Sequence, residues 1–297
     1  MKTLYRDLVE RLGAGLNVLP DKAEETPETT VCALWQAAAG VPVSVQNVND
    51  LALVPLDAVQ IERLQELVLQ RIAGIPVAYL TGRQRFMNLE FLAGPEALIP
   101  RRETELLGGA ALDVLHGMAA DGAQVVVVDV CTGSGNLALA LAHHAAKARV
   151  YAADLSAEAV SLACRNAHHL RLEHRVEFRV GDLLSPFDEP CFHRSVDLLV
   201  CNPPYISSGK VDAMPHEIIR HEPRVAFDGG PLGIRIIQRL IGEAPRFLRA
   251  GGCLAFEVGL GQGPGFVKRL SADGRYVGVR PIEDAAGAIR AIVAEAR

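Results

Sequence analysis

The sequence Val-Val-Val-Val-Asp-Val-Cys-Thr-Gly-Ser-Gly-Asn runs from residue 125 to residue 136, and the expected class of fold follows from it. The continuous run at 125–130, which stops at a glycine turn, is typical of a buried parallel strand. The residues after the turn predict a helix. A glycine turn between strand and helix lets a ligand approach the backbone and meet free N–H groups at the helix start.

The same alternation continues along the chain. Further strands are expected at 149–153, 176–180, 196–201 and 253–258, and helices at 137–146, 156–170 and 234–248. The stretches 276–279 and 288–293 predict a closing hairpin. Strands that alternate with helices at this spacing predict a doubly wound α/β sheet with right-handed crossovers.

Residues 1–75 have a different, helical pattern. Leu4, Leu8 and Leu12 fall four apart, and Gly74 is placed to end a later helix that opens near residue 57. Apolar stripes of this kind predict a small helical bundle. Periodicity alone does not distinguish a structural cap from a platform that recognises a substrate.

Residues 76–105 are expected to link this bundle to the α/β domain, which we assign to residues 106–297. Short extended pieces are predicted at 77–80 and 89–92, with Gly82 between them. Two such pieces separated by glycine and polar residues indicate a β-hairpin.

The overall composition disfavours several classes of protein. The 297 residues carry 30 Lys and Arg against 35 Asp and Glu, a balance that argues against non-specific binding of nucleic acid. Six scattered cysteines without a Cys-x-x-Cys pair indicate reduced thiols, and no apolar run approaches the roughly 20 residues that span a bilayer. The histidines lack the spacing of a metal site. These features predict a soluble cytoplasmic protein without a metal.

Acidic residues follow the second and third predicted strands. Asp154 lies 19 residues beyond Gly135, where a carboxylate can accept both ribose hydroxyls of a nucleoside. The turn lacks the third glycine of a dinucleotide fingerprint, so a nicotinamide cofactor is disfavoured. Asp182 could accept the exocyclic amine of an adenine, with Leu183 against the ring. An ordinary polar turn would explain Asp182 equally simply.

The fourth strand is followed by Asn202-Pro203-Pro204-Tyr205. Two prolines make a stiff loop with bare carbonyl groups. Asn202 adds a side-chain acceptor, and Tyr205 offers an aromatic face. This combination suits a planar NH₂ group whose two hydrogens need acceptors.

The order of glycine turn, acidic strand end and Asn-Pro-Pro-Tyr loop resembles the class I S-adenosylmethionine-dependent methyltransferases that alkylate planar nitrogens. The resemblance implies a Rossmann-like domain with a mixed seven-stranded sheet. Further stretches look like those of the protein-(glutamine-N5) methyltransferases, whose best-known members modify the Gly-Gly-Gln glutamine of bacterial peptide chain release factors. These stretches are residues 78–82, 98–105, 221–223 and 284–290.

The resemblance implies a role for each matching position. The cofactor would be S-adenosyl-L-methionine, with S-adenosyl-L-homocysteine as product. Asp154 would bind its ribose, Asp182 and Leu183 would flank its adenine, and Asn202 would lie beside it. The rest of the cofactor would contact the glycine turn, namely Cys131, Thr132, Gly133, Ser134 and Gly135. The glutamine amide would be held by Asn202, Pro203, Pro204 and Tyr205.

The resemblance also implies the partners. We expect a monomer whose helical segment 1–75 recognises a release factor, with no direct contact to nucleic acid or membrane. The release-factor branch usually has glycine at position 131, whereas Cys131 is closer to a sister branch that methylates a large-subunit ribosomal protein. That ribosomal substrate is therefore an alternative. The same motifs also leave open N6-adenine methylation of nucleic acid, and an assembly protein that binds the cofactor without catalysis.

Overall fold

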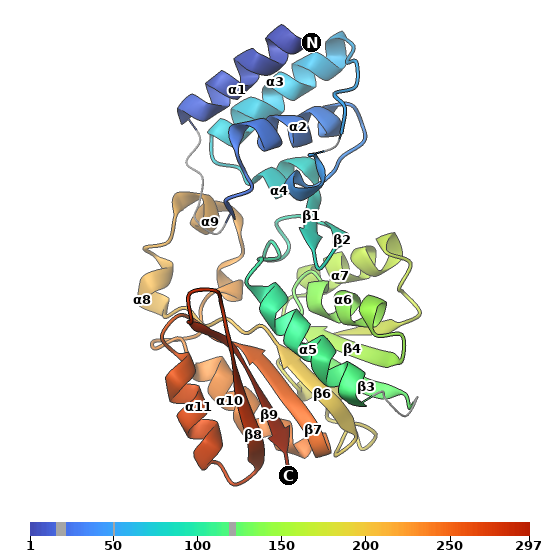
Figure 1. Ribbon diagram of the computed structural model, residues 1–297, viewed down its shortest axis with the longest axis vertical. Helices are drawn as coiled ribbons and strands as arrows, with labels where there is room; N and C mark the ends of the chain where they lie inside the picture. The colour runs from blue at the N-terminus through green and yellow to red at the C-terminus, as the bar shows by residue number, and fades with distance from the viewer. Residues whose placement is uncertain (16–21, 50, 119–122) are drawn as a thin grey trace.

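The computed structural model describes residues 1–297 apart from residues 16–21, 50 and 119–122. Helices gather at the N-terminal end of an elongated molecule, and an α/β layer structure forms the other end (Figure 1). The N-terminal helices are α1 (Lys2–Gly15), α2 (Pro27–Ala38), α3 (Ala58–Ile72) and α4 (Val77–Thr81). Short 3-10 turns occur at Val45–Asn47, Ser185–Phe187, Arg224–Ala226 and Ala244–Arg246.

The N-terminal helices share a hydrophobic core of their own. Leu8, Leu12, Leu34, Trp35 and Leu64 are completely buried in it. Helix α3 begins with a capping box: the Asp57 side chain accepts from the Gln60 N–H, and the Gln60 side chain accepts from the Asp57 N–H. The apolar stripes expected from the sequence therefore pack against one another.

The structure corrects the linker at residues 77–80. These residues form helix α4 and pack on the N-terminal core, with Val77 and Ala78 buried. The hairpin pairs β1 (Arg83–Phe86) with β2 (Leu89–Leu92), so its second strand was predicted correctly and its first was not. The β-propensity of the four residues is overridden by their burial against other helices.

A mixed sheet of seven strands forms the centre of the second domain. Its order is β5-β4-β3-β6-β7-β9-β8, with β9 antiparallel to both neighbours and the other pairs parallel. This arrangement confirms the predicted Rossmann-like class. The strands are β3 (Val125–Val130), β4 (Ala148–Asp154), β5 (Val176–Val180), β6 (Val196–Cys201), β7 (Leu248–Glu257), β8 (Tyr276–Glu283) and β9 (Ile289–Ala296).

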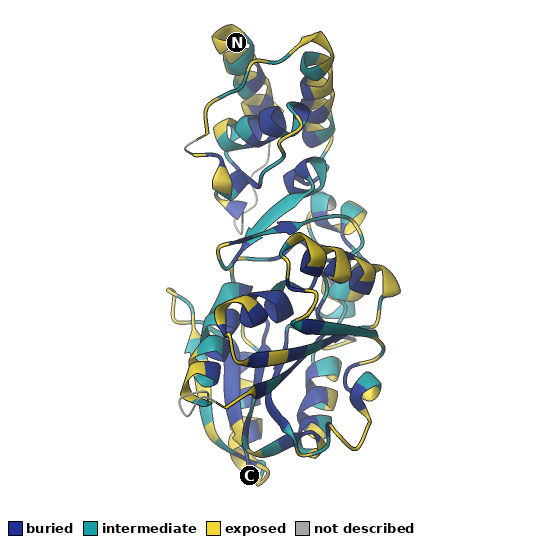
Figure 2. Ribbon diagram, turned by 90° about the vertical axis from the view of Figure 1, so that its right-hand side faces the viewer, coloured by how far each residue is buried: buried dark blue, intermediate teal, exposed yellow. Residues whose placement is uncertain are grey.

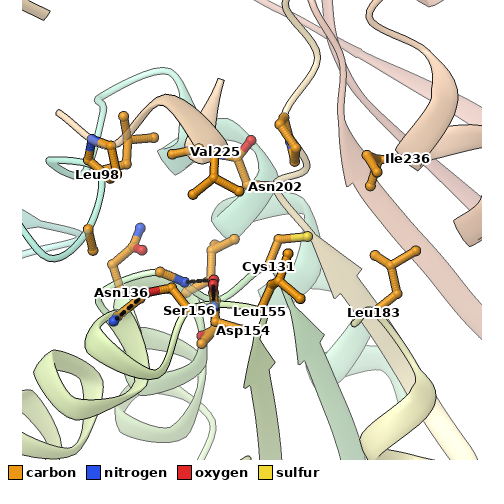
Figure 3. A pocket seen from close by; sticks show the side chains of 18 of the residues that line it. Leu98, Cys131, Asn136, Asp154, Leu155, Ser156, Leu183, Asn202, Val225 and Ile236 are labelled. Carbon is orange, nitrogen blue, oxygen red and sulfur yellow. Dashed lines mark hydrogen bonds between the residues drawn. The ribbon is translucent and has the colours of Figure 1, made fainter. Parts of the chain in front are cut away.

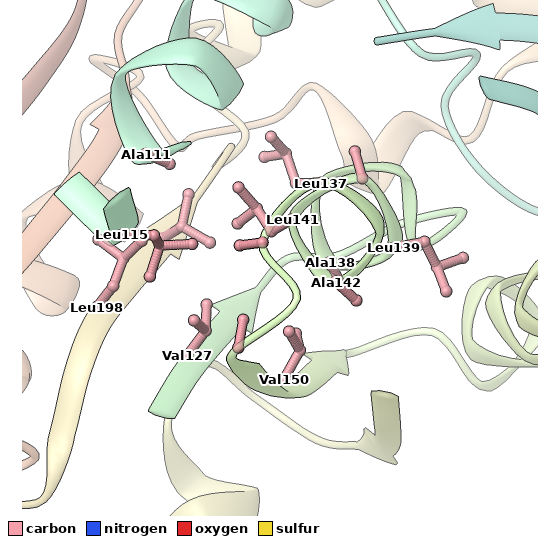
Figure 4. Packing of buried hydrophobic residues seen from close by; sticks show 14 of the residues in the cluster. Ala111, Leu115, Val127, Leu137, Ala138, Leu139, Leu141, Ala142, Val150 and Leu198 are labelled. Atoms are coloured by element: carbon pink, nitrogen blue, oxygen red, sulfur yellow. The ribbon is translucent and has the colours of Figure 1, made fainter. Parts of the chain in front are cut away.

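Helices cover both faces of this sheet. Helices α5 (Thr104–Met118), α6 (Asn136–His144) and α7 (Ala157–His169) lie on one face. There Leu115 and Leu141 pack with Val127, Val150 and Leu198 of the strands (Figure 4). The opposite face is covered by α10 (Arg235–Glu243) and α11 (Gly263–Ala272). The burial pattern in Figure 2 follows these layers, with dark strands between helices whose outer sides are exposed.

Several elements differ from those expected, and the strands of the closing hairpin extend to residues 283 and 296 instead of 279 and 293. Helix α10 ends at residue 243, five residues before the predicted end, and β7 begins five residues before the predicted start. Helix α11 and the short helices α8 (Ser208–Val211) and α9 (His216–His221) were not predicted. Across the described residues, no helix is both long and apolar enough to cross a membrane.

A buried cluster of charges joins the N-terminal helices to α9. Arg71 of α3 contacts Glu25 at 3.0 Å and Glu217 of α9 at 2.8 Å, and Lys22 also lies 2.8 Å from Glu217. Burial by itself would raise the pKa of Glu217, but the charges and hydrogen bonds of Lys22 and Arg71 outweigh it and lower that pKa. The cluster therefore ties the position of α9 to the helical end of the molecule (Figure 1).

Candidate active site

A pocket lies at the carboxyl ends of β3, β4 and β6, where the sequence predicts ligand binding. It brings together eight of the twelve predicted site residues (Figure 3). These are Cys131, Thr132, Gly133, Asp154, Asp182, Leu183, Asn202 and Pro204.

The glycine turn has two different functions. Cys131 and Gly133, at φ 59° and 56°, line the pocket in left-handed backbone conformations. Ser134 and Gly135 do not line it: Ser134 is buried, and a Cβ on Gly135 would lie 3.0 Å from Cβ of Ala163. Gly135 therefore allows the start of α6 to pack closely against α7.

Asp154 is held by the backbone at the end of β4. Its Oδ2 accepts from the Gly133 N–H at 2.8 Å, and its Oδ1 accepts from the Ser156 N–H at 3.0 Å (Figure 3). Burial raises the pKa of Asp154, and these backbone N–H groups oppose the shift. A carboxylate has about four lone-pair positions. The Leu155 N–H also lowers the Asp154 pKa, and the remaining positions are left for ligand hydroxyl groups.

The opposite end of the pocket is a slot with apolar walls. Leu183 lines one side with 4% of its surface exposed, and Asp182 is paired with Arg239 at 2.9 Å. The sequence did not predict Val225 and Ile236, which also line the pocket (Figure 3). A flat aromatic ring fits such a slot, with polar groups reaching Asp182 at its edge.

The Asn-Pro-Pro-Tyr loop lies between this pocket and a second one. Asn202 lines both pockets, Pro204 lines the first, and Pro203 and Tyr205 line the second. The Asn202 Nδ2 donates to Oγ1 of Thr104 at 3.0 Å. The side-chain oxygen of Asn202 is therefore left to face the pockets.

The second pocket has buried charges in its wall. The Tyr205 hydroxyl donates to Oε1 of Glu257 at 2.8 Å, and burial raises the pKa values of both groups. Glu103 Oε2 and Arg290 Nε also lie buried there, with no hydrogen-bond partner among the described residues. A ligand with polar groups of its own would give these buried atoms hydrogen-bond partners.

The segment after α9 closes the side of the first pocket. Glu222 is 5% exposed, and its Oε2 accepts from the Ile99 N–H at 3.1 Å. Its other oxygen pairs with Arg101, and the next residue, Pro223, lines the pocket. Residues 98–101 and 222–226 are thereby held together around the site.

Several pocket residues were missed because their roles depend on distant partners. Thr104 contacts Asn202 from 98 positions away in the chain. The only sequence signal for it is its place inside the stretch 98–105 that carries the family resemblance. Val225 and Ile236 have no local signal at all.

Comparisons with known proteins show the family of the chain. Residues 109–258 match the family model of the methyltransferase small domain. The catalytic domain of hMettl16, solved in complex with the MAT2A 3'UTR hairpin 6, has a TM-score of 0.52 at 12% identity. It covers 77% of this chain and 81% of that one, and at this identity the likeness concerns the fold alone. The fold and the site together define a methyltransferase.

Relatives of higher sequence identity show to which family of methyltransferases the chain belongs. It is 40% identical over 235 residues to a release factor glutamine methyltransferase of Moorella thermoacetica, which covers 79% of this chain and 80% of the relative. A protein of the same name from Gloeobacter violaceus is 38% identical, over 78% of this chain and 79% of its own length. The chain belongs to the release factor glutamine methyltransferase family.

Proposed function

We propose that the protein transfers a methyl group from S-adenosyl-L-methionine to the side-chain N5 of a glutamine in a protein. The favoured substrate is the Gly-Gly-Gln motif of a peptide chain release factor. The observation that carries this proposal is the orientation of Asn202, whose Nδ2 is engaged by Thr104 while its oxygen is free between two pockets. The names of the relatives support the choice of substrate.

The chemistry of the first pocket fits an adenosyl cofactor. Asp154 retains acceptor positions for ribose hydroxyls, and the slot beside Leu183 suits the adenine ring. The turn at Cys131 and Gly133 leaves room for the amino-acid end. When bound, the cofactor supplies a methyl group on a cationic sulfur, which is the electrophile of the transfer.

The second pocket would position the glutamine amide. An amide nitrogen is a poor nucleophile because its lone pair is delocalised into the carbonyl. The Asn202 Oδ1 and the Pro203 carbonyl would accept the two N–H bonds, which orients the nitrogen and stabilises positive charge developing on it. The transfer would replace the S–C bond of the donor with a new C–N bond, and the alkylated amide would then release one proton to solvent. Tyr205 would pack on the amide and exclude water.

Other parts of the chain are assigned by the same proposal. We propose that residues 1–75 form a domain that binds the body of the protein substrate, that 76–105 link it, and that 106–297 carry the reaction. Release factors act where translation occurs, so the site of action would be the cytoplasm. A monomer without direct contact to nucleic acid stays a prediction, as does the alternative ribosomal substrate suggested by Cys131.

The direct test offers the purified protein a choice of substrates. Release factor, large-subunit ribosomal proteins and nucleic acid are each incubated with methyl-labelled cofactor, and the modified residue is located by mass spectrometry. We expect label on the Gly-Gly-Gln glutamine, no label when that glutamine is replaced by alanine, and little label with Asn202→Ala enzyme. Label on a ribosomal protein or on adenine would reject the release factor as substrate.

A further inference from the structure

The orientation of the Asn202 amide decides whether its oxygen can serve the reaction, so any role assigned to that orientation rests on the proposed function. Methyl transfer to an amide needs the oxygen of Asn202, not its NH₂ group, turned toward the acceptor. The two ends of a carboxamide are nearly equal in size, so packing barely distinguishes them. A hydrogen-bond partner has to select one orientation.

Thr104 is that partner. It is the first residue of α5, is 1% exposed, and its Oγ1 lies 3.0 Å from Asn202 Nδ2. A hydroxyl group can both donate and accept, however. Thr104 selects the orientation only if its own hydrogen is already committed elsewhere.

The buried Oε2 of Glu257 is the acceptor for this hydrogen: it has no other hydrogen-bond partner among the described residues, and Thr104 is near enough to lower the Glu257 pKa. Glu257 is the last residue of β7, is 2% exposed, and accepts from the Tyr205 hydroxyl at 2.8 Å. Burial raises the pKa of Glu257, while hydrogen bonds from Thr104 and Tyr205 and the charge of Arg290 lower it. On balance the Glu257 pKa lies above its ordinary value, and the ionised form of Glu257 can only accept hydrogen bonds. With the Thr104 hydrogen directed to Glu257, the Thr104 lone pairs remain for the Nδ2 of Asn202.

We propose that Thr104 and Glu257 are positioning residues for the methyl transfer. Glu257 orients the hydroxyl of Thr104, and Thr104 in turn holds Asn202 with its NH₂ group inward and its oxygen toward the acceptor amide. The same carboxylate holds the Tyr205 hydroxyl. One buried side chain thus aligns both the first and the last residue of the Asn-Pro-Pro-Tyr loop.

The kinetic test compares two substitutions of Thr104. Thr104→Val has the same shape without the hydroxyl, and Thr104→Ser keeps the hydroxyl. We expect Thr104→Val to lower kcat about tenfold, as for a lost buried hydrogen bond, with unchanged cofactor affinity. Thr104→Ser should recover most of that loss. Equal loss in both variants, or full activity of Thr104→Val, would overturn the proposal.

A double-mutant cycle tests whether Thr104 acts through Asn202. In the Asn202→Ala background, Thr104→Val should cause no further loss of kcat, because there is no amide left to orient. An undiminished tenfold loss in that background would show that Thr104 acts by another route. Glu257→Gln should lower kcat in the Thr104 parent and lower it less in Thr104→Val, where only the contribution through Tyr205 remains.

A spectroscopic readout separates this inference from the choice of substrate. In protein labelled with ¹⁵N on asparagine, the Asn202 side-chain signal is identified by its absence in Asn202→Ala. It should shift in Thr104→Val and stay in place in Thr104→Ser, with no protein substrate present. An unshifted signal in Thr104→Val overturns the positioning role. If the signal behaves as expected but the parent protein does not methylate the release factor, the proposed function is overturned and the positioning role is not.

Discussion

Replacement of Asp154 by asparagine tests the assignment of the cofactor pocket at its most constrained residue. The two carboxylate oxygens accept from the backbone N–H groups of Gly133 and Ser156, at 2.8 and 3.0 Å. An asparagine has only one accepting oxygen. In Asp154→Asn, the NH₂ group must therefore face one of these backbone donors, and only one oxygen remains to accept from a ribose hydroxyl.

The expected loss of affinity follows from the change in hydrogen bonds to the cofactor. A bond to a charged acceptor contributes about 1.5–3 kcal/mol, and a neutral one about 1 kcal/mol. Weakening two ribose bonds in this way costs about 2 kcal/mol, which raises the Kd roughly 30-fold. One backbone N–H group loses its acceptor in Asp154→Asn, both in the free protein and in the complex. This lost bond therefore lowers the stability of the fold more than the affinity for the cofactor.

Calorimetric titration with S-adenosyl-L-homocysteine measures this change. Asp273→Asn is a matched control, because it removes one negative charge after α11, where Asp273 pairs with Arg275 away from the pocket. A cofactor analogue without ribose hydroxyls should bind the parent and Asp154→Asn with equal affinity. If Asp154→Asn binds the intact cofactor as tightly as the parent, or if both substitutions weaken binding alike, the ribose assignment is refuted.

Asn202→Ala should lower kcat about a hundredfold, because it removes an acceptor of the reacting amide, and leave the Kd of the cofactor within a few-fold; parallel losses would contradict the role. Gly135→Ala should destabilise the fold by about 2–4 kcal/mol, since φ is +79° and the new Cβ would lie 3.0 Å from Ala163; an unchanged urea midpoint would refute this. Burial raises the pKa of Asp129 to about 7, so the native state holds a proton that the unfolded chain has released. Its stabilising contribution is therefore present below about pH 4 and is lost as the pH rises to about 7, and Asp129→Asn should flatten this dependence in urea unfolding. Glu217→Ala removes a carboxylate partner of the buried Lys22 and Arg71 and so weakens the tie between α9 and the N-terminal helices. It should therefore raise the KM for the protein substrate without changing the Kd of the cofactor. An unaltered KM would show that the position of α9 does not affect substrate binding.

Elements with a strong local pattern were predicted to the residue. Strands β3, β5 and β6 occur at the expected bounds, because each is a short apolar run between turn residues. Ser156, where the helix 156–170 was expected to begin, caps α7, since it accepts from a backbone N–H three residues on. Capping and turn chemistry act over three or four residues, so the sequence alone shows them.

The errors occurred where distant contacts override local preference. Residues 77–80 resemble a strand, yet they form a helix because burial on the N-terminal core satisfies their apolar side chains in that form. Helix α11 escaped prediction because it opens with Gly263, Pro264 and Gly265, which are typical of a loop. The Cβ position of Gly263 is occupied by Ile289 of β9, a contact the local sequence does not reveal.

The sequence by itself determined the class of protein and the order of its binding loops, because a strand, a turn and a helix are specified by neighbouring residues. Only the tertiary structure decided which atom of Asn202 faces the pockets. It also separated Gly133, which lines the first pocket, from Gly135, which serves packing. The partners that make these distinctions lie far away in the chain: Thr104 is 98 residues from Asn202, and Glu257 is 52 residues from Tyr205. Hydrogen bonds over such separations exist only once the sheet has brought its strand ends together.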